Sequence, residues 1–228
     1  MKSKKSGSVG VLYLKTYNLT LVFGWAYILL KYLQSDFTST VDSNLWHNVK
    51  WPVIIFQHAA LLEIIHAIVG LVKSNPVLTI FQVFSRIIIV DGVLLATPES
   101  YAASSIGLPL ALLAWSITEI IRYLYYFMNL NECTPYVLTW LRYTLFLVLY
   151  PTGVTGELLC AYAATQYAKS HPEAWSYTLP NSWNFTFSYY CILVTIMLSY
   201  IPLFPQLFFH MVAQRHKILG KDSLKKAQ

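Results

Sequence analysis

The chain has 228 residues, of which 56% are hydrophobic and only 11% are charged. Water-soluble domains carry about a quarter charged residues, so this composition excludes one. It predicts that most of the chain lies in lipid, as a single all-α transmembrane domain over residues 1–228. The formal net charge of +6 does not indicate a nucleic-acid partner, because the basic residues gather at the two ends of the chain.

Six apolar stretches are long enough to cross a bilayer as helices, which takes about twenty residues. They cover residues 12–33, 52–72, 77–97, 107–128, 136–165 and 185–209. We therefore expect a polytopic bundle of six transmembrane helices over residues 12–209, with basic tails at residues 1–11 and 210–228. The fifth stretch contains Pro151, which removes one helical hydrogen bond, so the fifth helix is expected to be kinked or broken near that residue.

Basic residues near the ends of these stretches predict the orientation. With both termini cytosolic, the cytosolic side receives the two basic tails, Lys73 and Arg122. The opposite side keeps only Lys31, Lys50 and Lys169, as the excess of positive charge on the cytosolic side of membrane proteins requires. The sequence Lys225-Lys-Ala-Gln228 is similar to the dilysine retrieval signal of endoplasmic-reticulum proteins, and the Asn184-Phe-Thr186 glycosylation sequon falls in a lumenal loop. We expect a multi-pass protein of the endoplasmic-reticulum membrane.

The stretch Leu149-Tyr-Pro-Thr-Gly-Val-Thr-Gly-Glu157 places a phenol, Tyr150, and a carboxylate, Glu157, inside the fifth apolar stretch. A carboxylate is costly at that depth, which favours a functional role. On a continuous helix the two groups would share a face, about 10 Å apart along the axis. Gly153 and Gly156 let the backbone bend or let another helix approach closely. A structural alternative is that Tyr150 bonds a backbone carbonyl while Glu157 pairs with an arginine.

Further ionisable residues lie within the predicted spans. If Glu157 is counted and His66 is taken as neutral, the spans contain three positively and four negatively charged side chains. This near balance predicts that the charges pair inside the bundle, because an unpaired charge in hydrocarbon is costly. A polar network that fixes helix packing is the favoured interpretation of Glu63, Asp91 and Glu119. Arg86 and Arg142 are functional candidates, because a guanidinium keeps its charge and can bind a phosphate or carboxylate through two hydrogen bonds.

Neither metal nor cysteine chemistry is predicted. Glu63-Ile-Ile-His66 has the Glu-x-x-His spacing of carboxylate-bridged di-iron bundles, but the second copy that such a site needs reads Glu119-Ile-Ile-Arg122. The cysteines are too few for a disulfide framework. None is followed by arginine at the Cys-x5-Arg spacing of a phosphatase loop, where the chain has Thr139, Gln166 and Met197. We expect no metal and no other cofactor.

Several separated motifs resemble one family of membrane enzymes. They are Tyr150-Pro-Thr-Gly-Val-Thr-Gly-Glu157, Leu62-Glu-Ile-Ile-His-Ala-Ile-Val-Gly-Leu71, Ser85-Arg86 and Trp115-Ser-Ile-Thr-Glu-Ile-Ile-Arg-Tyr123. Together they are similar to the very-long-chain (3R)-3-hydroxyacyl-CoA dehydratase family, also called protein-tyrosine-phosphatase-like, which includes the plant PASTICCINO proteins. The resemblance implies a six-span enzyme of fatty-acid elongation that converts 3-hydroxyacyl-CoA to trans-2-enoyl-CoA. It also implies that Tyr150 and Glu157 are the catalytic residues.

Dehydration beside a thioester needs a base for the proton on C2 and an acid for the hydroxyl on C3. Our hypothesis is that Tyr150 is the base and Glu157 the acid; the reverse assignment, or a Glu157 that only activates Tyr150, stays open. Arg86, Arg142 and Tyr143 are expected to meet the CoA phosphates or to brace this pair, and the acyl tail to lie in an apolar cavity. Expected partners are the substrate, membrane lipid and other elongation enzymes. Competing classes are a non-catalytic membrane adaptor of the elongation complex and a proton-coupled carrier.

Overall fold

The computed structural model describes residues 8–35, 43–72, 74–177 and 179–226, and most of this part of the chain is helical. In chain order the elements are α1 (Ser8–Leu33), α2 (Ser43–Ala59), α3 (Leu61–Ile68), α4 (Pro76–Ile89), the π-helix η1 (Val90–Leu95), α5 (Gly107–Leu130), α6 (Tyr136–Thr144), α7 (Phe146–Ser170) and α8 (Tyr189–Lys226). One isolated antiparallel bridge joins Tyr177 to Phe187. The predicted all-α class is confirmed for these residues.

Five stretches of the described residues are long and apolar enough to cross a membrane. They are Leu45–Ile68, Pro76–Leu95, Gly107–Leu130, Phe146–Ser170 and Tyr189–Gly220. These stretches overlap the second to sixth predicted spans, so the chain has the composition and helix lengths of a multi-pass membrane protein. The predicted first span is helical as α1, but it is not among the five, and it carries polar side chains such as Lys15 and Asn18.

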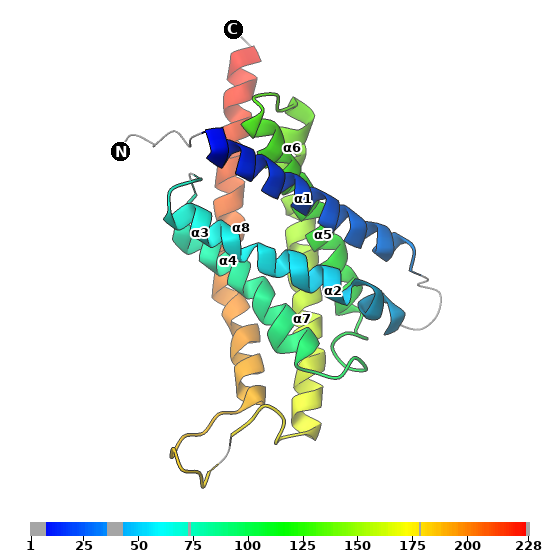
Figure 1. Ribbon diagram of the computed structural model, residues 1–228. Coiled ribbons are helices and arrows are strands. Elements are labelled where there is room, and N and C mark those ends of the chain that lie inside the picture. Colours follow the sequence, from blue (N-terminus) through cyan, green and yellow to red (C-terminus); the bar gives the residue numbers. More distant parts are fainter. Residues whose placement is uncertain (1–7, 36–42, 73, 178, 227–228) are drawn as a thin grey trace.

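The bundle is organised around α5, which packs most extensively against α1 and α7 (Figure 1). The core contains large buried rings, among them Trp25 of α1, Trp46 of α2 and Trp115 of α5. In contrast, α8 packs against α7 and α6 and leaves most of its surface uncovered. In its most apolar stretch only 6% of the residues are buried inside the molecule. An apolar helix with this much free surface is suited to contact with lipid.

The start of α4 follows from local sequence. The side-chain oxygen of Asn75 accepts a hydrogen bond from the backbone N–H of Val77 at 3.0 Å, as an N-cap residue does. Pro76 is the first helical residue, a position where its missing N–H removes no helical hydrogen bond. Asn75 thus ends the connection between α3 and α4, in which Lys73 lies outside the described residues. This start sets the register of the helix that carries Arg86.

Pro52 and Pro151 lie inside helices rather than at their ends, as Pro202 and Pro205 of α8 also do. Pro52, expected at the start of the second span, lies within α2, which already begins at Ser43. Pro151 lies within α7, so the kink or break expected near Pro151 is not confirmed. The span is interrupted instead at Leu145, between α6 and α7. A proline ring crowds the carbonyl four residues before it, so its disturbance acts on the N-terminal side, where the interruption lies.

The last helix differs from its predicted limits at both ends. α8 begins at Tyr189 rather than at residue 185, because Phe187 exchanges two backbone hydrogen bonds with Tyr177, at 2.8 and 2.9 Å. It continues to Lys226, so most of the expected basic tail after residue 209 is helical. The basic residues Lys2, Lys4 and Lys5 and the end of the dilysine sequence lie outside the described residues.

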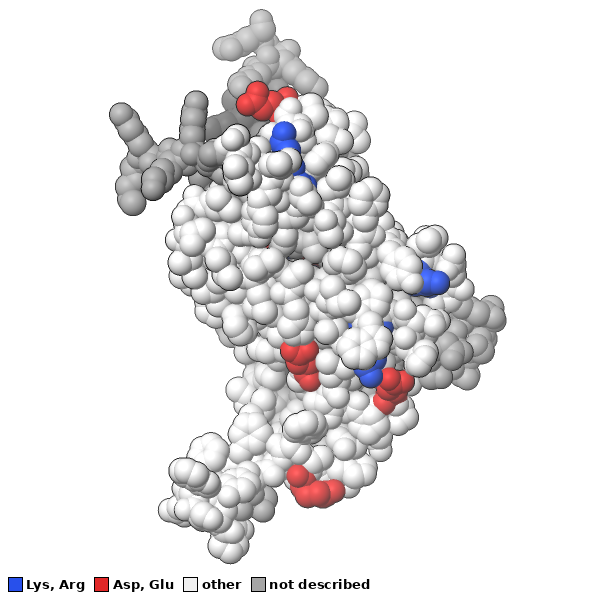
Figure 2. All heavy atoms as spheres, viewed as in Figure 1, with Lys and Arg blue, Asp and Glu red and all other residues white. Residues whose placement is uncertain are grey.

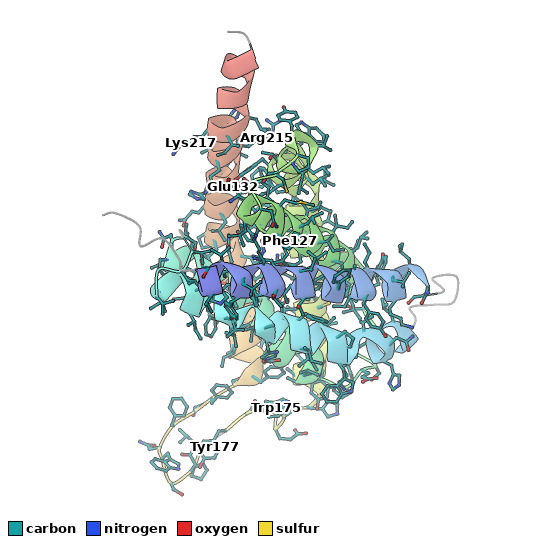
Figure 3. All side chains as sticks on the ribbon, turned by 45° about the horizontal axis from the view of Figure 1, so that its top comes forward. Phe127, Glu132, Trp175, Tyr177, Arg215 and Lys217 are labelled. Atoms are coloured by element: carbon teal, nitrogen blue, oxygen red, sulfur yellow. The ribbon has the colours of Figure 1, made fainter. Side chains whose placement is uncertain are left out.

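The two ends of the molecule differ in character. On the face of the molecule shown in Figure 2, only a few side chains are charged. In Figure 3, Arg215 and Lys217 lie on α8 at one end, while Trp175 and Tyr177 lie in the loop at the opposite end. Basic residues at one end of a last apolar helix and exposed aromatic rings at the other are typical of a protein that crosses a membrane.

Candidate active site

Glu157 lies on α7 between two hydrogen-bond donors, and its residue is only 7% exposed. The indole N–H of Trp115, on α5, donates to Oε1 at 2.8 Å. The hydroxyl of Tyr200, on α8, donates to Oε2 at 2.6 Å. Both oxygens are therefore hydrogen-bonded, as a buried carboxyl group requires. The described hydrogen bonds of Glu157 come from an indole and a phenol on two other helices, and not from an arginine.

Two glycines let α5 and α7 approach closely enough to form the Trp115 contact. A Cβ at Gly156 would lie 2.5 Å from the backbone nitrogen of Ala111. A Cβ at Gly107 would lie 2.4 Å from the carbonyl oxygen of Gly156. No side chain fits at such distances, so the close helix approach predicted for Gly156 is confirmed. Gly153 has more room, with 3.3 Å between its would-be Cβ and that of Ala114.

Tyr150 lies on α7, with its half-buried ring against α8. The ring is stacked on Phe204, with centroids 5.1 Å apart and 5° between the planes. It is also stacked on Phe208, at 6.3 Å and 19°. Both Glu157 and Arg86 are close enough to the Tyr150 phenol to act on it electrostatically. The structure therefore brings a phenol, a carboxyl group and a guanidinium into one region formed by α4, α7 and α8.

Arg86 belongs to a chain of ion pairs inside the bundle. Its Nη1 donates to Oε1 of Glu119 on α5. Nη2 of Arg122 is 2.7 Å from Oε2 of Glu119 and 2.7 Å from Oε1 of Glu63 on α3. The hydroxyl of Tyr123 also donates to Glu63. Since Glu119 is only 1% exposed, the pairing of charges expected in the bundle interior is confirmed for these four residues.

Arg142 and Tyr143, the other two candidate residues, lie in a separate aromatic cluster. The Arg142 guanidinium is 4.5 Å from the ring centroids of both Tyr125 and Tyr126, and 5.6 Å from that of Tyr143. Its Nη2 also donates to the Tyr126 hydroxyl at 3.1 Å. No described contact joins either residue to Tyr150 or Glu157. Their cation–π contacts hold the guanidinium at the end of the bundle formed by α5 and α6.

The sequence does not indicate which groups hold Glu157. Trp115 lies within one of the motifs quoted above, but nothing in that motif indicates which carboxyl group it meets. Tyr200 is one of 17 tyrosines and had no distinguishing signal. A second pair was also missed: Nε2 of His58, on α2, lies 3.0 Å from Oδ2 of Asp91, on η1. Such partners depend on how the helices are arranged in space.

Glu63 and His66, which have the spacing of a di-iron motif, do not form a metal site together. Among the residues that the structure describes, no group of three or more His, Cys, Asp or Glu side chains is arranged to hold a metal ion. Glu63 pairs with Arg122, whereas Nε2 of His66 lies 3.0 Å from the hydroxyl of Tyr13. The two side chains with di-iron spacing therefore have different partners.

The fold and this site define a class: a multi-pass membrane protein whose helices enclose a hydrogen-bonded carboxyl group beside a phenol and an arginine. The sequence profile of the family described as "Protein tyrosine phosphatase-like protein, PTPLA" matches residues 57–221. The chain belongs to this family.

Its relatives come from animals and plants. The chain is 44% identical over 219 residues to mouse very-long-chain (3R)-3-hydroxyacyl-CoA dehydratase 2. These residues cover 96% of this chain and 85% of the relative. It is 45% identical to the Caenorhabditis elegans dehydratase hpo-8, over 94% of this chain and 97% of the relative. It is 38% identical to rice dehydratase PASTICCINO 2A, over 92% and 94%. No solved structure matches the chain.

Proposed function

We propose that this chain catalyses the dehydration of (3R)-3-hydroxyacyl-CoA to trans-2-enoyl-CoA, a step of very-long-chain fatty-acid elongation. Family membership and the names of the relatives, which are very-long-chain (3R)-3-hydroxyacyl-CoA dehydratases, support this hydro-lyase activity. The observation that carries the proposal is the buried Glu157 carboxyl group, held by two donors and lying within electrostatic range of the Tyr150 phenol.

The reaction needs two protonic groups that act on adjacent carbons. We assign Tyr150 as the base that takes the proton from C2, and Glu157 as the acid that protonates the hydroxyl leaving C3. Arg86 acts electrostatically in favour of the Tyr150 phenolate, whereas burial and the charge of Glu157 act against it, so the base role requires Glu157 to hold its proton. Glu119 holds Arg86 in turn, so the ion-pair chain braces the catalytic pair.

In this proposal the substrate lies along the bundle, with its CoA part toward the α6 end. Arg142 and Tyr143 precede Tyr150 by about two helical turns, on the order of 10 Å, toward the α6 end of the bundle. There they meet the pantetheine arm or the phosphates of CoA. The acyl tail lies among apolar side chains and lipid, where each buried CH₂ contributes about 0.8 kcal/mol. This arrangement keeps the charged part of the substrate in water and the thioester beside Tyr150.

The membrane arrangement in this proposal is one transmembrane domain of six spans, with α1 as the first. Both termini lie in the cytosol, and the chain resides in the endoplasmic-reticulum membrane. Arg215 and Lys217 at one end of α8, opposite the aromatic loop, support this orientation. Membrane lipid and the other enzymes of fatty-acid elongation are the proposed neighbours.

The test is turnover of 3-hydroxyacyl-CoAs of graded chain length by the purified protein. Tyr150→Phe and Glu157→Gln should each lower kcat by about 100-fold or more, because each removes one protonic group and keeps the shape of the side chain. Tyr162→Phe on the exposed face of α7 and Glu132→Gln in the loop after α5 are matched controls and should keep wild-type turnover. Full activity of either catalytic variant would end the assignment. No turnover by folded wild type, together with retained binding to elongation enzymes, would favour the adaptor.

A further inference from the structure

The two hydrogen-bond partners of Glu157 differ in chemistry. Trp115 offers an indole N–H, which can only donate, so Oε1 of Glu157 must act as an acceptor in every protonation state. Tyr200 offers a hydroxyl, which can donate or accept. When Glu157 is ionised, Tyr200 donates to Oε2. When Glu157 is protonated, the proton sits on Oε2 and the Tyr200 oxygen accepts it, because a proton on Oε1 would face the indole hydrogen.

The position of the two partners separates the oxygens in space. Trp115 lies on α5, in the core, and is 2% exposed. Tyr200 lies on α8, one turn before Phe204, whose ring is stacked on Tyr150. The Oε2 oxygen therefore faces α8, the same helix against which the Tyr150 ring lies. Oε1 faces the closed contact between α5 and α7.

We propose that Tyr200 and Trp115 are positioning residues that confine the exchangeable proton of Glu157 to Oε2 and direct it toward the side of the site occupied by Tyr150. This inference rests on the proposed dehydration. Trp115 prevents protonation of Oε1, and Tyr200 fixes the direction in which the proton on Oε2 points. The distance of 2.6 Å between the Tyr200 hydroxyl and Oε2 lies in the range of a strong hydrogen bond to a charged oxygen.

The proton balance of a turnover fits this arrangement. The C2–H bond breaks and its proton goes to the Tyr150 phenolate, while the electron pair forms the C2–C3 double bond. The C3–O bond breaks as the leaving hydroxyl takes the Oε2 proton of Glu157 and departs as water. Glu157 is then a carboxylate and Tyr150 carries the proton from C2, while Tyr200 turns from acceptor to donor. Transfer of the proton from Tyr150 to Oε2 of Glu157 restores both groups, so the net change is the loss of one water, and each oxygen has a partner before and after the step.

The first test removes single donors. Tyr200→Phe keeps the ring and should lower kcat by about 10- to 100-fold while KM changes by less than about twofold, since the acid is misdirected but binding is kept. Its control is Tyr190→Phe on the same helix. Trp115→Phe should also lower kcat, and its control is Trp25→Phe, which shortens another buried indole whose Nε1 has no described hydrogen-bond partner.

The second test separates positioning from a general effect on the fold. In a Glu157→Asp background the shortened carboxyl group no longer spans both donors, so Tyr200→Phe should then cost less than about threefold. A purely structural loss would be of the same size in both backgrounds. Monodisperse elution and an unchanged melting temperature establish that each variant is folded, and Trp115→Phe carries the test if Tyr200→Phe is not.

The outcomes distinguish this inference from the proposed function. Wild-type kcat in folded Tyr200→Phe and Trp115→Phe, or an equal loss in the two backgrounds, overturns the positioning role alone. Absence of turnover by the folded wild type overturns the dehydration itself. Full activity of Glu157→Gln overturns the assignment of Glu157 as the acid, and the positioning role with it. If Tyr200→Phe lowers kcat with KM unchanged, and this effect disappears in the Glu157→Asp background, the result supports both the positioning role and the dehydration.

Discussion

Glu119 is the residue on which the buried ion pairs depend, because it faces Arg86 with one oxygen and Arg122 with the other. Glu119→Gln keeps the shape of the side chain but leaves two guanidinium groups in the bundle interior with less negative charge than they need. Removing one partner of a buried ion pair costs about 3 to 5 kcal/mol. We therefore expect a fall of that order in the free energy of unfolding, measured by thermal or denaturant unfolding in detergent.

A matched variant is available on the surface. Glu99 pairs with Lys50 at 3.3 Å, and the two side chains are 43% and 31% exposed. Exposed pairs contribute about 1 kcal/mol or less, so Glu99→Gln should change stability little. If Glu119→Gln and Glu99→Gln unfold alike, the buried chain does not stabilise the bundle. Because Arg86 also acts on Tyr150, Glu119→Gln should lower kcat as well, and Glu99→Gln should not.

At this scale the sequence predicts the charged residues of the bundle better than their partners. A charge in an apolar stretch is costly, so the sequence alone marks Glu119, Glu157 and Arg86 as residues with a specific role. The donors Trp115 and Tyr200 are not marked in this way, because tryptophan and tyrosine are common in membrane helices and carry no such cost. Their role depends on which helices are neighbours, which residue spacing does not encode.

At the scale of a single element, α7 combines a predictable feature with an unpredictable one. Its glycines indicated a close helix contact, and Gly156 makes one because a backbone without Cβ is needed wherever two helices nearly touch. Pro151 indicates a kink or a break nearby, yet α7 runs through it and the interruption lies at Leu145. Neighbouring helices can hold a proline-containing helix together, so the position of a break is set by packing as well as by the proline.

The glycine contact leads to a prediction about the element. Gly156→Ala places a Cβ 2.5 Å from the Ala111 nitrogen and 2.7 Å from the Gly107 oxygen, both backbone atoms that cannot rotate away. The α5 and α7 helices must then separate, which costs about 1 to 3 kcal/mol and lengthens the contact between Trp115 and Glu157. We expect a lower melting temperature together with a lower kcat, measured on the same purified sample.

Gly92→Ala is the control for this change. Gly92 is also helical, but the nearest side-chain atom to its would-be Cβ is 3.9 Å away, in Ile88. The extra methyl group fits there, and removing a glycine from a helix stabilises it by about 0.4 to 1 kcal/mol when the conformation is compatible. A melting temperature equal to or above that of the wild type is therefore expected. Equal losses in both variants would mean that the approach of α5 to α7 is not limiting.

For the whole molecule, composition is enough to predict a helical membrane protein, because a chain with 11% charged residues has too little polar surface to stay in water. The number of spans is harder to predict. α1 is a helix of 26 residues packed against α5, but Lys15 and Asn18 lower its apolar character, and it is not among the five candidate spans. A helix that buries polar residues against its neighbours loses the uniform apolar signal by which spans are recognised.

The three cysteines report the orientation of the whole molecule. Cys133 is exposed after α5, Cys191 is exposed near the start of α8, and Cys160 is buried in α7. With both termini cytosolic, a membrane-impermeant maleimide added to sealed endoplasmic-reticulum vesicles should label Cys133 at once, Cys191 only after permeabilisation, and Cys160 only after denaturation. Variants with a single cysteine, the other two changed to serine, assign each signal. Labelling of Cys191 in sealed vesicles, with Cys133 protected, would reverse the orientation, and the assignment of the α6 end to the CoA side of the membrane would fall with it.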